Sequence, residues 1–81
     1  MLQLKILNIE NIIYEGIVTM INVPGIEGNF QVLQNHDNII SVLKNGYIDL
    51  LEQDSKEIKK ISIHNGGAIE VRKNIIKILV F

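Results

Sequence analysis

Apolar residues recur along this chain in short runs with a period of two, which is the spacing of a β-strand rather than a helix. The first run, at residues 2–7, is expected to bury one face made of Leu2, Leu4 and Ile6. A longer stretch, at residues 12–23, is expected to bury one face made of Ile17, Thr19, Ile21 and Val23. Gly16 within this stretch indicates a bulge or a change of direction. Residues 52–60 come nearest to a helical period, and their charges suit a solvated hairpin tip equally well.

Turn signals separate the apolar runs. We expect loops or turns at Pro24–Asn29, Gln34–Asn38, Asn45–Gly46, Gln53–Lys56, Asn65–Gly67 and Lys73–Asn74. Asn-Gly between two apolar runs is a strong hairpin signal, because a type I′ turn needs positive φ at both central residues. Residues 39–44 and 47–51 should therefore pair as a hairpin, and the double glycine should close a second one. The glycines expected at turns are Gly25, Gly46, Gly66 and Gly67.

The spacing of these runs predicts the fold class. About eight strands separated by turn signals every 8–12 residues are typical of an all-β sandwich or barrel. The composition agrees, since 17 Ile and 6 Val stand against a single Ala, and β-branched residues favour strands. We predict one domain over residues 1–81, a small two-sheet antiparallel β-sandwich of about eight to ten strands. The apolar run Ile75–Phe81 should be its buried last strand.

Length and charge exclude several classes of protein. The chain has 81 residues, no cysteine and a formal net charge of −1, so no disulfide can hold the core. A nucleic-acid-binding barrel needs a basic groove with stacking aromatic residues, and the aromatic residues number only four. No apolar run reaches the roughly 18–20 residues that cross a bilayer, so no direct membrane span is expected.

Residues that carry out catalysis are scarce. The two histidines are His36 and His64, and only the pair His36-Asp37 sets a histidine beside a carboxylate. A metal site needs three or four ligands, and no serine lies in a nucleophile motif. We therefore predict no enzyme activity, no catalytic residue, no metal and no cofactor.

Several segments together resemble a known family. They are Val23–Gly28 (VPGIEG), His36, Ile39–Gly46 (IISVLKNG) and Gly66–Val71 (GGAIEV). In this order they resemble the N-terminal domain of the epsilon subunit of F-type ATP synthase, over the whole chain. The family pattern has prolines where this chain has Gln34 and Asn38, and a glycine where it has Gln31.

The resemblance implies a function without an active site. The domain would be a central-stalk subunit of a proton-translocating rotary ATP synthase, packed on the gamma subunit and resting on the c-ring. It would lie on the cytoplasmic face of the inner (plasma) membrane as a peripheral subunit, with an organellar origin left open. The alternative is a free-standing β-sandwich that binds other proteins.

The resemblance also implies site residues. The loop facing the c-ring would contain Glu27, Gly28, Asn29 and Phe30, and the gamma interface would contain His36, Ser41 and Asn8. Each of three residues has a plainer role: Glu27 as a turn residue, His36 as a hydrogen-bonding partner of its own loop, and Ser41 as a solvent-facing strand residue.

The family usually continues into a C-terminal helical hairpin that regulates ATP hydrolysis. This sequence stops at its last predicted strand, so we hypothesise a coupling subunit without that regulatory element. The alternative is that the sequence is truncated, and the intact mass of the protein from its source distinguishes the two.

Overall fold

The computed structural model describes residues 1–81, which form eight strands and no helix. In chain order these are β1 (Leu2–Leu7), β2 (Ile12–Gly25), β3 (Gly28–Val32), β4 (Ile39–Leu43), β5 (Gly46–Glu52), β6 (Ile58–Ile63), β7 (Gly67–Arg72) and β8 (Ile75–Val80). The predicted all-β fold is confirmed, with the strand count at the lower end of the expected range.

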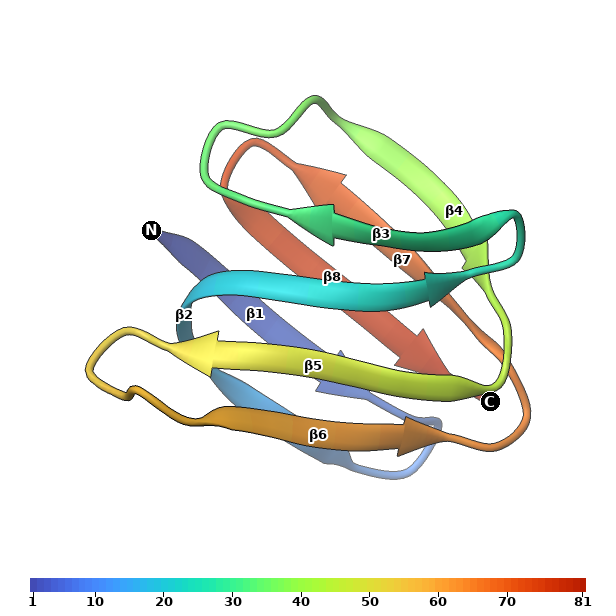
Figure 1. The fold of residues 1–81 in the computed structure, drawn as a ribbon. Helices are drawn as coiled ribbons and strands as arrows, with labels where there is room; N and C mark the ends of the chain where they lie inside the picture. The colour runs from blue at the N-terminus through green and yellow to red at the C-terminus, as the bar shows by residue number, and fades with distance from the viewer.

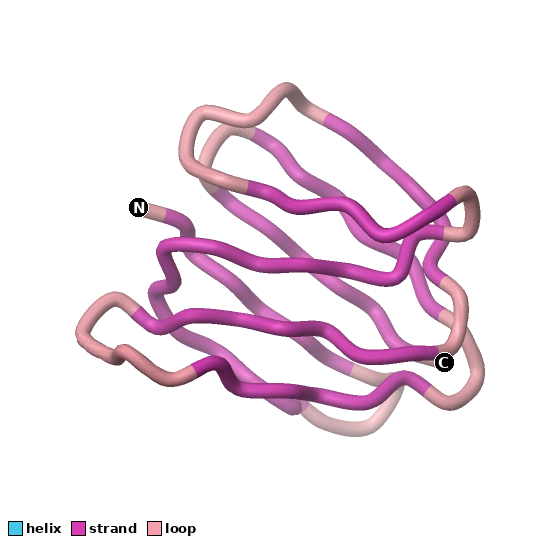
Figure 2. The backbone as a smooth tube through the Cα atoms, in the orientation of Figure 1, coloured by secondary structure: helices cyan, strands magenta, loops and turns pink.

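The strands form two layers. Figure 1 shows β3, β2, β5 and β6 in the near layer, and β1, β8 and β7 behind them. Strand β4 pairs with β7 and so continues the second layer, in the order β4-β7-β8-β1. All pairs are antiparallel except β1 with β8, which is parallel. The tube in Figure 2 shows short loops joining these strands at both ends of the sandwich.

Strand β2 belongs to both layers. Its first half pairs with β1, and its second half pairs with β5 and β3. The register with β5 shifts between Val18 and Met20, which is a bulge that lets the strand pass from one sheet to the other. The predicted common face is therefore wrong: Ile21 and Val23 are buried, but Ile17 is 44% exposed and Val18 is buried in its place.

Two predicted hairpins are also wrong. Strands β4 and β5, on either side of Asn45–Gly46, do not pair with each other, because β4 pairs with β7 and β5 pairs with β2 and β6. The connection at Asn65–Gly66 likewise joins β6 of one sheet to β7 of the other. Both connections cross between the layers, and they contact each other where Gly66 N donates to Asn45 Oδ1 at 2.8 Å.

The other connections follow the predictions more closely. The polar segments before β6 and β8 close the β5–β6 and β7–β8 hairpins. The loop predicted at Pro24–Asn29 is shorter than expected, because β2 runs to Gly25 and β3 starts at Gly28. Only Ile26 and Glu27 remain to form that turn.

The core lies between the layers and is entirely apolar. It consists of 16 buried residues, and no polar or charged residue is buried. The predicted inward face of β1 is confirmed, and Ile76, Ile78 and Val80 make the last strand part of the core. Phe81, however, is 65% exposed. The structure contains no helix with the length and apolar character needed to cross a membrane.

Candidate partner-binding surface

The loops gather at two ends of the sandwich. One end, here called the Glu27 end, contains the C-terminus and the connections at 8–11, 26–27, 44–45 and 64–66. The other, the His36 end, contains the N-terminus and the connections at 33–38, 53–57 and 73–74. The predicted c-ring loop thus lies at one end, whereas the predicted gamma-interface residues are divided between both ends and a strand.

The predicted c-ring loop is a tight turn at the tip of the β2–β3 hairpin. Ile26 N donates to Val42 O at 3.1 Å, which fixes this tip against β4. Glu27, Gly28 and Asn29 are exposed, whereas Phe30 is half-buried and packs on the core. The first three residues are therefore accessible to a partner, and the Phe30 ring instead supports the hairpin from within.

Ser41 lies next to this hairpin. It occupies the middle of β4, opposite Ile69, and is half-buried. A cavity of about 450 Å³ between β3 and β4 is lined by Ser41 together with Ile26, Glu27, Phe30, Ile40, Val42 and Ala68. The structure thus brings one predicted gamma residue and two predicted c-ring residues to a single hollow.

His36 lies in the β3–β4 loop at the opposite end and is half-buried. Its Nδ1 is 2.7 Å from the carbonyl oxygen of Asp37. A carbonyl can only accept, so Nδ1 carries the proton and donates, and in the neutral ring Nε2 is left as an acceptor. The backbone N of His36 donates to Leu33 O at 3.2 Å. The ring therefore has one nitrogen engaged by its own loop and one available.

Asn8 shapes the β1–β2 connection. Its Oδ1 accepts from the backbone N of Glu10 at 2.9 Å and of Asn11 at 2.7 Å, and its own N donates to Asn11 O. The Asn8 side chain therefore stabilises the turn to which it belongs. Asn8 also lines a cavity of about 720 Å³ at the Glu27 end, beside Ile9 and Phe81.

A feature that the sequence reading missed lies on the outer face of the β4-β7-β8-β1 sheet. The pairing registers place five apolar residues in one row across it, in the order Val42, Ala68, Leu79, Leu7 and Ile12. Val42 is 54% exposed and Ile12 is 56% exposed. We call these five residues the outer apolar row. Val42 follows Ser41 and Leu7 precedes Asn8 in sequence, so two of the predicted gamma residues lie next to members of this row, although Ser41 shares the inner face with the buried Ile69.

The row beside it is charged. Glu70, Lys77, Lys5 and Glu15 align across the same face next to Ile40, with a 3.5 Å ion pair between Lys5 and Glu15. A surface with an apolar stripe bordered by charges is typical of a protein-binding face. The outward positions of each strand could be read from the sequence, but their alignment into a row could not, because it depends on which strands pair.

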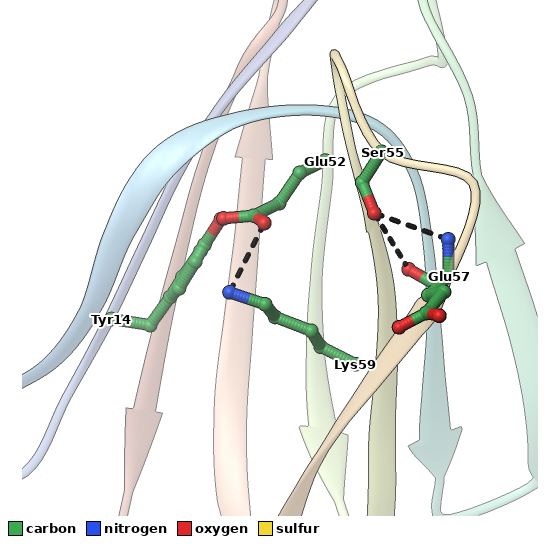
Figure 3. A network of polar contacts seen from close by, with 5 residues as sticks. All are labelled: Tyr14, Glu52, Ser55, Glu57 and Lys59. Atoms are coloured by element: carbon green, nitrogen blue, oxygen red, sulfur yellow. Dashed lines mark hydrogen bonds and ion pairs between the residues drawn. The ribbon is translucent and has the colours of Figure 1, made fainter.

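A polar network joins the sheets at the His36 end (Figure 3). Tyr14 of β2 donates from its hydroxyl to Glu52 Oε2 of β5 at 2.7 Å, and Lys59 of β6 lies 3.0 Å from Glu52 Oε1. Burial, followed by the hydrogen bond to Glu52, raises the pKa of Tyr14 to about 12. The hydrogen bonds from Tyr14 and Lys59 lower the pKa of Glu52. The phenol is therefore a donor at neutral pH, and the network is a structural tie.

The features described above are surfaces, loops and a polar network. No group of three or more His, Cys, Asp or Glu side chains is arranged to hold a metal ion. By its fold and surface, this is a small antiparallel β-sandwich with an apolar outer row.

A family model described as the ATP synthase, Delta/Epsilon chain, beta-sandwich domain matches residues 1–81. The chain belongs to this family, as the resemblance predicted.

Curated relatives are ATP synthase epsilon chains. The chain is 37% identical over 79 residues to the ATP synthase epsilon chain of Sulfurimonas denitrificans, covering 98% of this chain and 59% of the relative. It is 37% identical over 79 residues to that of Helicobacter pylori strain Shi470, covering 98% of this chain and 62% of the relative. The chain thus spans about three-fifths of the length of these relatives.

Solved structures share the fold. A chain of the Euglena gracilis mitochondrial ATP synthase (OSCP/F1/c-ring) matches with a TM-score of 0.86 at 19% identity, over 98% of this chain and 49% of that one. A chain of the Tetrahymena thermophila mitochondrial ATP synthase central stalk/c-ring matches with a TM-score of 0.78 at 16% identity, over 99% and 63%. At such identities the likeness shows the β-sandwich fold alone.

Proposed function

We propose that this chain is the β-sandwich of an epsilon-type central-stalk subunit in a proton-translocating rotary ATP synthase. It packs on the gamma subunit, faces the c-ring and couples the two without catalysing a reaction itself. As such it is a peripheral subunit on the cytoplasmic face of the membrane. Family membership, the epsilon chains among its relatives and the ATP synthase stalk among its structural neighbours support this proposal.

The single observation that carries the gamma contact is the outer apolar row. Val42, Leu79 and Ile12 in this row are exposed, and the row crosses the β4-β7-β8-β1 sheet from Val42 to Leu7 and on to Ile12 of β2. Covering an aliphatic side chain that is now half-exposed contributes on the order of 1 kcal/mol. Several such side chains in one row give a partner a continuous stripe to cover, with the neighbouring charges at its border.

A matched pair of substitutions tests this surface. Val42→Lys places a charge in the outer apolar row, and Ile58→Lys places one at a similarly exposed position on β6, where the wild-type residue is 47% exposed. We expect Val42→Lys to weaken binding to the isolated gamma subunit by about tenfold or more, and Ile58→Lys to leave it unchanged. Binding is measured by calorimetry at micromolar concentration. Equal effects of the two variants would exclude this row as the gamma surface.

The Glu27 turn carries the proposed c-ring contact. Glu27 lies at the tip of the β2–β3 hairpin with its side chain exposed, so a partner that approaches the Glu27 end can contact it. Because the chain has no cysteine, Glu27→Cys introduces a unique thiol. In the assembled complex a short bifunctional cross-linker should join it to a c subunit. Asp54→Cys, in the β5–β6 turn at the other end, is the control and should give no such product; a product from Asp54→Cys alone would reverse the proposed orientation.

A further inference from the structure

Side-chain amides tie the β3–β4 loop to the β7–β8 turn. Asn35 N donates to Asn74 Oδ1 at 2.8 Å, and Lys73 N donates to Asn38 Oδ1 at 2.8 Å. Each segment therefore supplies one asparagine oxygen to a backbone N–H of the other. Both amide oxygens are identified by chemistry, since a backbone N–H must meet an acceptor.

The two donors in this exchange share an unusual backbone. Asn35 has a φ of 66° and Lys73 a φ of 58°, and they are the only non-glycine residues with positive φ in the chain. Such a conformation is disfavoured for L-residues, most of all for one like Lys73 that lacks a short polar side chain. It persists where the surroundings hold it in place. Here the surroundings are the two asparagine side chains.

Two further contacts hold the same loop. Asn74 Nδ2 lies 3.4 Å from Asn35 Oδ1, and the N-terminal ammonium of Met1 donates to Gln34 Oε1 at 2.7 Å. The loop is thus fixed to the N-terminus on one side and to the β7–β8 turn on the other. His36 lies in the same loop, and its Nδ1 donates to Asp37 O.

We propose that Asn38 and Asn74 are positioning residues: they fix the β3–β4 loop on the β7–β8 turn and so hold His36, which the family resemblance assigns to the gamma interface, in one orientation. This inference rests on the proposed function for the identity of the partner. Both asparagines act on His36 through the loop backbone that they hold in place. Their effect on binding is the ordering of the loop before the partner arrives, which lowers the entropy that binding must overcome.

The test uses amide hydrogen exchange and gamma binding on the same variants. In Asn38→Ala the Lys73 amide loses its acceptor, and in Asn74→Ala the Asn35 amide does. We expect both variants to speed exchange at the His36 amide and to weaken gamma binding by about fivefold each. Asn38→Asp keeps the acceptor oxygen and should restore both values. Asn65→Ala, exposed in the β6–β7 connection at the opposite end of the sandwich, is the control and should change neither.

The outcomes separate the two proposals. Unchanged exchange at His36 in both alanine variants overturns the positioning role of the asparagines. Faster exchange with unchanged gamma affinity also overturns it, because the loop is then held but does not serve binding, while the outer apolar row keeps its role. If the wild-type chain does not bind gamma, the proposed function fails, and the positioning role fails with it.

Discussion

The two ends of the sandwich hold their connections together by different means. At the Glu27 end backbone atoms join several connections directly: Lys44 N donates to Pro24 O at 2.8 Å, and Phe81 N donates to Gly66 O at 3.0 Å, beside the side-chain acceptors of Asn8 and Asn45. The His36 end also has side-chain contacts, namely the hydrogen bonds that Asn38 and Asn74 accept and the hydrogen bond from Tyr14 to Glu52. The first end contains two glycines that backbone atoms approach closely, Gly25 and Gly67, whereas the second has hydrogen bonds that involve asparagine, glutamine and tyrosine side chains.

This difference has a physical cause. At Gly25 and Gly67 a backbone oxygen lies within 2.6 Å of where a Cβ would stand, so these two positions at the Glu27 end require glycine. A side-chain oxygen reaches across a wider gap and can be supplied by more than one residue type. We therefore expect substitutions at the Glu27 end to act mainly on stability, and conservative substitutions at the His36 end to be tolerated.

The largest effect is expected at Gly67, where β7 lies against β8. A Cβ placed there would be 2.5 Å from Leu79 O and 3.3 Å from Val80 Cα, both of them backbone atoms. Gly67→Ala should lower the free energy of unfolding by about 3 kcal/mol, because the strands must move apart to admit the methyl group. Urea denaturation followed by circular dichroism measures it. Asn29→Ala, exposed at the same end, is the control; a similar small loss in both variants would contradict this account.

A smaller effect is expected at the Tyr14 hydroxyl. Tyr14→Phe removes the hydrogen bond to Glu52 and leaves the ring in place. We expect a loss of about 1 kcal/mol in the free energy of unfolding, again by urea denaturation. Tyr47→Phe, whose side chain is 60% exposed, provides the comparison and should change little. A loss as large as that of Gly67→Ala would mean that the two ends do not differ as described.

The smallest effect is a change in how stability depends on pH. The pKa of Tyr14 is raised from 10.0 to about 12, so this contribution is fully present below pH 10 and is lost as the pH rises through about 12. The pKa of Glu52 is lowered below its ordinary 4.5, so its contribution is present above pH 4.5 and is lost as the pH falls below that value.

Thermal unfolding of wild type and Tyr14→Phe across these two pH ranges measures both contributions. The difference in melting temperature between the two proteins should shrink toward the alkaline limit and toward the acid limit. The reason is that the hydrogen bond that distinguishes them is lost at each limit. A difference that stays constant from well below pH 4.5 up to about pH 12 would show that the Tyr14–Glu52 contact does not titrate.

The candidate site was predicted in part from the sequence. The positions of the Glu27 turn and of the His36 loop followed from turn residues and from the family resemblance, because both are local features. The outer apolar row could not be found in this way, since Val42 and Ile12 are 30 positions apart and are linked only through three intervening strands. The hydrogen bonds between the β3–β4 loop and the β7–β8 turn were missed for the same reason: Asn35 and Asn74 are 39 positions apart.

The sequence by itself determined that this chain is all-β, where most of its strands lie and which face of β1 is buried, because alternation and turn residues act over a few neighbouring positions. The tertiary structure decided which strands pair, where β2 passes between the sheets and why Asn45–Gly46 joins two layers instead of closing a hairpin. Pairing depends on contacts between distant residues, and a shift of one residue at the Val18–Met20 bulge reverses the buried face of everything that follows. That reversal buries Ile21 and Val23 together with Val18, and leaves Ile17 outside.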